Sequence, residues 1–132
     1  MTDILSDMLT RIRNGQKASL VEVLLFNPMP TRCRQVLILL QKEGFILGFK
    51  NVVINNKEYV SVLLKYTLNN VPLITKIKRV STSGKRIYCK SKHLWKIFNG
   101  KGIFIISTTQ GLATDTQARL WNLGGEVICY LE

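Results

Sequence analysis

The stretch Gly102-Ile-Phe-Ile-Ile-Ser-Thr-Thr-Gln-Gly-Leu-Ala-Thr-Asp115 decides how the C-terminal half of this chain folds. Its apolar run at 103–106 predicts a buried strand, and three consecutive hydroxyl side chains follow at 107–109. Gly111 permits a tight turn or a close approach of the backbone to a ligand. Thr114-Asp115 supplies two residue types that cap helices. The stretch therefore predicts a strand, a hydroxyl-rich glycine turn and the start of a helix.

Outside this stretch, the spacing of apolar residues predicts an α+β protein of two small lobes, each a short mixed or antiparallel sheet with one or two helices. The polar segment 67–72 separates two apolar patterns, so we expect an N-terminal lobe at 1–68 and a C-terminal lobe at 69–132. Helices are expected from a cap at Thr2 or Asp3 to Asn14-Gly15, from a cap at Thr31 to Gly44, and at 114–121, with a helical turn at 92–98. Strands are expected at 21–26, 45–49, 51–54, 58–66, 73–80, 86–89, 102–107 and 126–130, with turns at 27–30, 55–56 and 81–84.

The charge of the chain is strongly and unevenly positive. It has 19 Lys and Arg against 8 Asp and Glu, for a net charge of +11, and no acid lies between Glu58 and Asp115. This asymmetry favours a polyanionic partner, with nucleic acid first and an anionic membrane second; a merely solvated surface is the alternative. No apolar run approaches the roughly 20 residues that span a bilayer. The acidic N-terminus resembles neither a secretory signal nor a basic transit peptide.

The reactive side chains form no complete catalytic or metal-binding set in the sequence. Cys33, Cys89 and Cys129 lie far apart without a CxxC pair, and the single His93 completes no ligand set. Ser107 lies in no Gly-x-Ser-x-Gly elbow, and the Gly-Lys-Ser/Thr of a phosphate loop is missing. We therefore expect reduced thiols and a protein that is not an enzyme, with no cofactor, no metal and no small-molecule substrate.

Contact with a folded RNA suits both the hydroxyl turn and the basic surface. Proteins recognise double-stranded RNA through its shallow minor groove, its 2′-hydroxyls, its phosphates and its unpaired bases, and short side chains such as Ser107 fit that surface. Tyr88 lies between Arg86 and Lys90, where it either stacks on an unpaired base or covers the edge of a core. Glu126 follows two glycines, where it accepts hydrogen bonds either from base amino groups or from the backbone of its own turn.

These motifs, in this order, resemble the bacterial-type family of small-subunit ribosomal protein eight. That family has Ser-Thr-Ser-Lys-Gly, an apolar pair, Thr-Asp, Ala-Arg and Gly-Gly-Glu, and the order and spacing hold here from Ser107 to Glu126. Further blocks that match in order are Asp7-Met-Leu-Thr-Arg-Ile-Arg-Asn-Gly15, Glu43-Gly-Phe-Ile46, Arg79-Val-Ser81 and Arg86-Ile-Tyr88. The resemblance implies a structural protein of the small ribosomal subunit. It would bind the central domain of the small-subunit rRNA, help assemble it for translation and touch neighbouring ribosomal proteins.

The candidate rRNA contacts combine this resemblance with the residue chemistry. We expect the C-terminal lobe to grip an irregular RNA helix and the N-terminal lobe to reach a neighbouring RNA segment. At the start of the second helix, N–H groups and side chains favour phosphate, although a simple cap beside two solvated arginines explains the same residues equally well. The candidates are Ser107, Thr108, Thr109, Gln110, Gly111, Tyr88, Lys85, Arg86, Gly124, Gly125, Glu126, Thr31, Arg32, Arg34, Arg13 and Asn14.

The sequence departs from the family pattern at several places, which include Thr109 and Ala113. Gln110 stands where the family has a lysine, and the segment 88–98 is richer in aromatic and basic residues. These departures favour a divergent ribosome, with a mitochondrion preferred over a plastid or a bacterial cytoplasm. Two alternatives of other classes stay open: a free RNA-binding regulator of translation, and a basic module that binds proteins or membranes.

Overall fold

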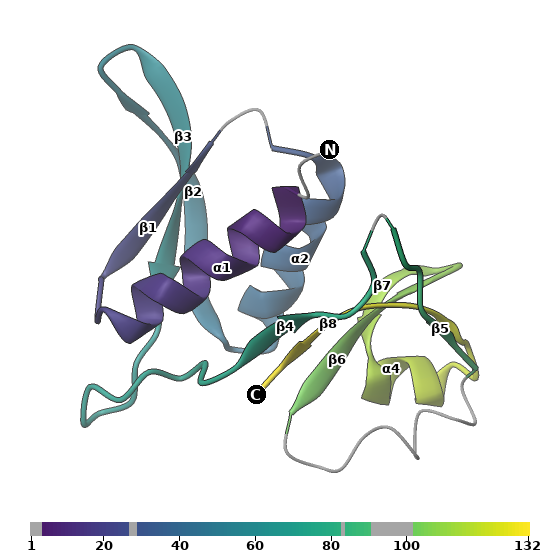
Figure 1. The fold of residues 1–132 in the computed structure, drawn as a ribbon. Helices are drawn as coiled ribbons and strands as arrows, with labels where there is room; N and C mark the ends of the chain where they lie inside the picture. The colour runs from purple at the N-terminus through teal and green to yellow at the C-terminus, as the bar shows by residue number, and fades with distance from the viewer. Residues whose placement is uncertain (1–3, 27–28, 83, 91–101) are drawn as a thin grey trace. The chain divides into compact units, whose positions relative to one another are not determined.

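The computed structural model describes residues 4–26, 29–82, 84–90 and 102–132, and within them the chain forms three helices and eight strands. The backbone contacts divide the chain into two compact units, Met1–Thr75 and Lys76–Glu132, each with an antiparallel sheet (Figure 1). The expected α+β class is thereby confirmed. The lobe boundary expected at residues 68 and 69 stays a prediction. The helical turn expected at 92–98 lies outside the described residues, as do the first half of the 27–30 turn and one residue of the 81–84 turn.

The first unit packs two helices on one face of its sheet (Figure 1). The helices are α1 (Ile4–Lys17) and α2 (Thr31–Lys42). The described strands lie in the order β1-β3-β2, with β1 at Glu22–Phe26, β3 at Lys57–Leu64 and β2 at Ile46–Ile54. Apolar residues recur every three or four positions on both helices, so each helix buries one stripe. These stripes are Leu5, Met8, Leu9 and Ile12 on α1 and Cys33, Val36, Leu37 and Leu40 on α2.

The first helix continues to Lys17, so the end expected at Asn14-Gly15 is wrong. A Cβ atom on Gly15 would lie 2.4 Å from Cγ2 of Val23, which shows that this glycine allows α1 to pack closely against β1. The chain turns instead at Ser19, whose φ is 60°. The N–H of Leu20 then donates to the carbonyl oxygen of Gly15 at 3.0 Å and closes the helix end.

The second helix begins and ends at defined backbone positions. Pro30, with φ −57° and ψ 147°, is its N-cap residue, and no side chain of the described residues caps it. Thr31 is therefore the first helical residue and not the cap, because the extended proline already directs the chain into the helix. At the other end, Glu43 is the C-cap residue and Gly44 follows with φ 81°, which confirms the expected stop.

Strands β2 and β3 form a hairpin. The segments expected as two strands, 45–49 and 51–54, belong to the single strand β2, whose register with β3 is irregular between Ile46 and Gly48. Asn55 and Asn56 have φ values of 52° and 63°. Two consecutive left-handed residues make the turn that matches strand twist, so the expected hairpin turn is confirmed.

The polar segment after β3 is a hydrogen-bonded turn. Tyr66 and Pro72 form an isolated antiparallel bridge. The N–H of Thr67 donates to the carbonyl oxygen of Val71 at 2.9 Å, and Asn70 occupies the left-handed region with φ 59°. The tyrosine hydroxyl also donates to the carbonyl oxygen of Leu20, which follows α1. The segment is thus held within the first unit and is not an open linker.

A buried glutamine holds both arms of this turn. Gln16 of α1 is 1% exposed; its side-chain amide donates to the carbonyl oxygen of Lys65 and accepts from the N–H of Ile74, both at 3.2 Å. Because the N–H of Ile74 is used in this way, it cannot join a strand ladder. The strand expected at 73–80 is correspondingly short, and β4 covers only Ile77–Arg79.

The second unit is a sheet with one described helix against it. Its strands lie in the order β4-β8-β6-β7, and β5 also pairs with β8. The elements are β5 at Tyr88–Cys89, β6 at Ile103–Thr108, β7 at Gly111–Thr114, α4 at Asp115–Leu120 and β8 at Gly125–Leu131. Helix α4 contacts β6 and β7 (Figure 1). In this contact, Ala118 packs against Ile106.

Strand β7 lies where the sequence predicts a turn that leads directly into a helix. The two exposed turn residues, Thr109 and Gln110, reverse the chain at once, so Leu112 pairs with Ser107. The helix start is nevertheless confirmed, because Oγ1 of Thr114 accepts the N–H of Gln117 at 3.2 Å.

Asp115 has a different role from the expected cap. It is fully buried, its Oδ1 accepts the N–H of Phe104 at 3.2 Å, and its Oδ2 lies 3.1 Å from Nη1 of Arg119. This carboxylate therefore ties the start of β6 to α4.

Candidate nucleic-acid interface

Three predicted contact residues from three strands lie in one row across the second sheet. Tyr88 of β5 pairs with Glu126 of β8, and Glu126 pairs with Ser107 of β6. Directly opposed residues in antiparallel strands have Cβ atoms about 4.5–5.5 Å apart and project from the same face. We call these three residues the cross-strand row. It brings a phenol ring, a carboxylate and a hydroxyl side by side from positions 19 residues apart in the sequence.

The cross-strand row projects away from α4. Cys89 and Ile106 pack around Ala118 of that helix. Successive strand residues project to opposite faces, so Tyr88 and Ser107 project to the other face of the sheet. Tyr88 is 70% exposed, which excludes the alternative that its ring covers the edge of a core. Base stacking by this ring stays a prediction.

An ion pair holds the carboxylate of the row. Nη1 of Arg86 donates to Oε2 of Glu126 at 2.9 Å, with the glutamate side chain 12% exposed and the arginine side chain 46% exposed. A half-exposed pair of this kind contributes little to stability because solvent screens it. Its main effect is to fix the orientation of the glutamate side chain.

The hydroxyl turn is stabilised from within. Oγ1 of Thr108 donates to the carbonyl oxygen of Gly111 at 2.8 Å and accepts the N–H of Gln110 at 3.2 Å. Gly111 has φ 111°, a conformation that favours glycine. Ser107 is half-buried, and its side chain makes no such bond with the described residues. Thr108 thus stabilises the turn, and a ligand contact of Ser107 stays a prediction.

The Gly-Gly-Glu segment does not form the second glycine turn that the sequence predicts. The chain turns at Asn122, whose φ is 56°, and the half-buried Gly124 comes just before β8. Gly125 already belongs to β8, and a Cβ atom there would lie 2.0 Å from the carbonyl oxygen of Ser107. The glycine is therefore required by the close approach of β8 to β6 at the cross-strand row.

A buried serine that the sequence did not single out orders the basic segment before β5. The hydroxyl of Ser81 is inside the protein, where it accepts the N–H of Ile87 at 2.8 Å and donates to its carbonyl oxygen at 3.2 Å. Thr82 and Lys85 exchange backbone hydrogen bonds of 2.8 and 3.2 Å. Lys85 and Arg86 are both exposed in this closed loop. In the sequence, the available sign of this role was that Ser81 is a small polar residue beside a turn.

The remaining predicted contacts belong to the first unit. Thr31 is exposed, and Arg32 and Arg34 are half-exposed, in the first turn of α2. Arg13 and Asn14 are exposed on α1, near its C-terminal end. The structure thus places these five residues at the ends of two different helices.

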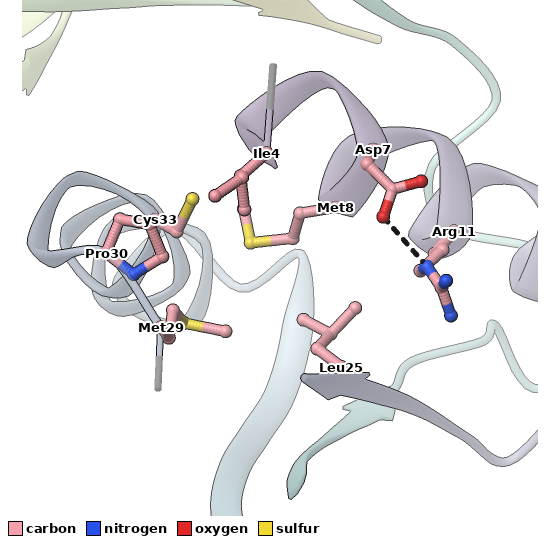
Figure 2. Close-up of a pocket in the computed structure, with 8 residues that line it drawn as sticks. All are labelled: Ile4, Asp7, Met8, Arg11, Leu25, Met29, Pro30 and Cys33. Atoms are coloured by element: carbon pink, nitrogen blue, oxygen red, sulfur yellow. Dashed lines mark hydrogen bonds and ion pairs between the residues drawn. The ribbon is translucent and has the colours of Figure 1, made fainter. Parts of the chain in front are cut away.

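The first unit also contains a small apolar pocket of about 180 Å³ (Figure 2). Arg11 donates to Asp7 at 3.0 Å, and these two are the charged lining residues. The lining residues are Ile4, Asp7, Met8, Arg11, Leu25, Met29, Pro30 and Cys33. None of the predicted RNA contacts lines this pocket.

The described residues contain no group of three or more His, Cys, Asp or Glu residues that could hold a metal ion. Burial raises the pKa of Cys129 to about 12, although the charge of Arg79 acts in the opposite direction, so this thiol is neutral at physiological pH. None of the helices in the described ranges has both the length and the apolar character needed to cross a membrane.

The fold and the site define a basic two-unit α+β protein with a polar row on one sheet face. The chain belongs to the family Ribosomal protein S8, whose sequence profile matches residues 3–131. It is 50% identical over 132 residues to the small ribosomal subunit protein uS8 of Wigglesworthia glossinidia brevipalpis, covering 100% of this chain and 98% of that protein. It is 44% identical over 129 residues to the protein of the same name from Rickettsia typhi (strain ATCC VR-144 / Wilmington), covering 98% and 96%. The resemblance drawn from the motifs is confirmed.

Proposed function

We propose that this protein is a structural constituent of the small ribosomal subunit that binds rRNA and helps assemble the subunit for translation. Family membership supports this function, because both relatives are named as proteins of that subunit. Membership in this family of structural proteins, and not the lack of a catalytic cluster, also supports a non-enzymatic role. The observation within the molecule that carries the proposal is the cross-strand row.

The cross-strand row offers three kinds of contact to an irregular RNA helix. The exposed ring of Tyr88 stacks on an unpaired base. The hydroxyl of Ser107 exchanges hydrogen bonds with a 2′-OH in the shallow minor groove. The carboxylate of Glu126, held by Arg86, accepts from a base amino group. A duplex without an unpaired base satisfies only part of this set, so the row selects RNA by shape.

The other predicted contacts support the row. Lysines and arginines attract phosphate regardless of sequence, whereas short polar groups form hydrogen bonds only with RNA of a matching shape. In this proposal the C-terminal lobe, 69–132, carries the specific contacts and the N-terminal lobe, 1–68, reaches a neighbouring RNA segment. The supporting contacts are Lys85, Thr108, Thr109, Gln110, Gly111, Gly124 and Gly125 in the first set, and Arg13, Asn14, Thr31, Arg32 and Arg34 in the second.

The finer parts of the proposal concern the partners and the compartment. We propose the central domain of the small-subunit rRNA as the binding site, with neighbouring ribosomal proteins as further partners. Both relatives named above are bacterial and give no support to the mitochondrial preference drawn from the sequence. That preference therefore stays a prediction, which the position of the ribosomes in fractionated cells would test.

The proposal is tested by binding of the purified chain to a central-domain rRNA fragment and to a regular duplex of equal length, across a salt series. We expect the fragment to be preferred, and the preference to persist at high salt, because shape contacts do not depend on counterion release. Equal affinities that fall together with salt would contradict shape recognition. Co-sedimentation with small subunits, in contrast to a free pool, distinguishes the ribosomal role from that of a free regulator.

A further inference from the structure

Tyr88, the exposed ring of the cross-strand row, lies in a strand of only two residues. Strand β5 covers Tyr88–Cys89, and its partner among the described strands is β8. So short a ladder contributes few hydrogen bonds. The ring is 70% exposed, so little packing is available to hold it. The position of Tyr88 therefore depends strongly on Ile87, the residue just before it.

The hydroxyl of Ser81 bonds to both polar backbone groups of Ile87. It accepts the N–H of Ile87 at 2.8 Å and donates to the carbonyl oxygen of Ile87 at 3.2 Å. The same carbonyl oxygen also accepts the N–H of Val127 of β8 at 2.9 Å. In an antiparallel ladder, two opposed residues exchange such a pair of bonds between their backbones. The serine side chain therefore takes the place of a strand partner for the residue that precedes β5.

Ser81 is itself fixed to β8, the strand that carries Glu126 of the row. Its backbone N–H donates to the carbonyl oxygen of Val127 at 3.1 Å. Ser81 is 0% exposed, so its hydroxyl is out of reach of a ligand and of competing water. Tyr88 is thus tied to β8 in two ways: by its own pairing with Glu126, and through the bonds that join Ile87 to Ser81.

We infer that Ser81 is a positioning residue for base stacking: it touches no RNA itself, and it sets the place of the Tyr88 ring. A side chain that is held in place before its ligand arrives loses less conformational freedom on binding, so the complex is tighter. This inference rests on the proposed function, because it presupposes that the ring stacks on a base of rRNA. It extends that function to a residue that lies wholly inside the protein.

The test compares two variants that lose the same kind of group from the second unit. S81A and T114A each delete a buried hydroxyl that accepts a backbone N–H, from Ile87 and from Gln117 respectively. Thr114 caps α4, and the cross-strand row projects away from that helix. We expect S81A to bind the rRNA fragment about 2–10-fold more weakly than the wild type, and T114A to bind like the wild type. Equal losses in the two variants would overturn the positioning role, because general destabilisation would explain both.

A double-mutant cycle with Y88A shows whether Ser81 acts through the ring. Y88A should bind the fragment about 5–150-fold more weakly than the wild type. Adding S81A to Y88A should then cause no further loss, because no ring remains to be positioned. A merely structural role would lower the affinity by the same factor with or without the ring. Additive losses, or full affinity in S81A, would contradict the inference.

S81C is a second variant, which keeps the test valid if S81A does not fold. A thiol of similar size fills the same space, but it is a weak hydrogen-bond donor and acceptor. S81C should therefore lose affinity in the same way, and again only when the ring of Tyr88 is present. Circular dichroism and thermal unfolding establish that each variant is folded before its binding is measured. Wild-type affinity in a folded S81C would show that the bonds to Ile87 do not position the ring.

The failure of this inference and the failure of the proposed function are distinguishable. If the wild-type chain shows no preference for the rRNA fragment over the duplex, the proposed function fails. If the wild-type chain prefers the fragment but S81A and T114A behave alike, the proposed function stands and the positioning role of Ser81 fails.

Discussion

The cross-strand row and the exposed arginine of α1 differ in what positions their side chains. In the row, strand register places Ser107 opposite Glu126. Arg13 instead carries a long cationic side chain at an exposed position of a helix. We propose that the groups of the row recognise the shape of an RNA, whereas long cations bind phosphate regardless of sequence. In this proposal, specificity and affinity belong to separate residues and can be changed separately.

We expect the largest effect from a substitution that blocks the close approach of β8 to β6. In Gly125→Val the new side chain has no room, because a Cβ atom would lie 2.0 Å from the carbonyl oxygen of Ser107. We expect a loss of about 1–3 kcal/mol or more in the free energy of unfolding, together with the loss of specific rRNA binding. Gly84→Ala is the control, since a Cβ atom at Gly84 meets nothing within 4 Å. Equal unfolding temperatures for the two variants would show that the strands do not approach as described.

The next effect should come from the row itself. Strand β6 is otherwise largely apolar and tolerates a leucine at position 107. The larger side chain, however, occupies the space that a 2′-OH would approach. Specific binding should be abolished, while a weak, salt-sensitive association remains. The control is Thr116→Leu, an exposed threonine on α4, which contacts the opposite face of the sheet. Intact specific affinity in the Ser107 variant would remove the hydroxyl turn from the mechanism.

A smaller loss is expected when the exposed ring is removed. Tyr88→Ala should weaken binding to the rRNA fragment by about 1–3 kcal/mol, the usual contribution of one stacked base. Tyr88→Phe keeps the ring and should retain most of the affinity, which separates stacking from hydrogen bonding by the phenol. If both variants bind like the wild type, Tyr88 is a surface residue that does not meet a base.

The smallest effect on stability at neutral pH is expected from the buried thiol of Cys129. Burial raises the pKa of Cys129 from 9.0 to about 12 in the folded protein. The unfolded chain loses this proton first, so the free energy of unfolding should be unaffected below pH 9. From there toward pH 12 it should fall by up to about 1.4 kcal/mol per pH unit. Urea unfolding of Cys129→Ala should show a shallower decline than the wild type. Parallel curves would mean that the thiol is not shielded from water.

Local patterns in the sequence predicted those parts of the fold that depend on near neighbours. The two asparagines at 55–56 gave the β2–β3 hairpin, and Thr114 gave the start of α4, because turn and cap chemistry act within a few residues. The helix end predicted at Gly15 was wrong because the role of this glycine is not local. Its role depends on Val23 of another element, and a glycine required by packing looks in sequence like one that ends a helix.

The residues of the candidate site could be selected one by one from the sequence, but their arrangement in space could not be predicted from it. Ser107, Tyr88 and Glu126 were each selected by chemistry and family resemblance, yet their alignment depends on the registers of β5, β8 and β6. Sheet register is a long-range property that residue types do not determine alone.

We propose that the cross-strand row sets specificity and that the cations of the first unit set electrostatic affinity. The most direct test measures two quantities for the wild type, Ser107→Leu and R13Q/R32Q: the ratio of the affinities for the rRNA fragment and the duplex, and the slope of log affinity against log salt. We predict that Ser107→Leu abolishes the preference and keeps most of the slope, and that R13Q/R32Q lowers the slope and keeps the ratio. Variants that change both quantities in the same proportion would contradict the division of roles.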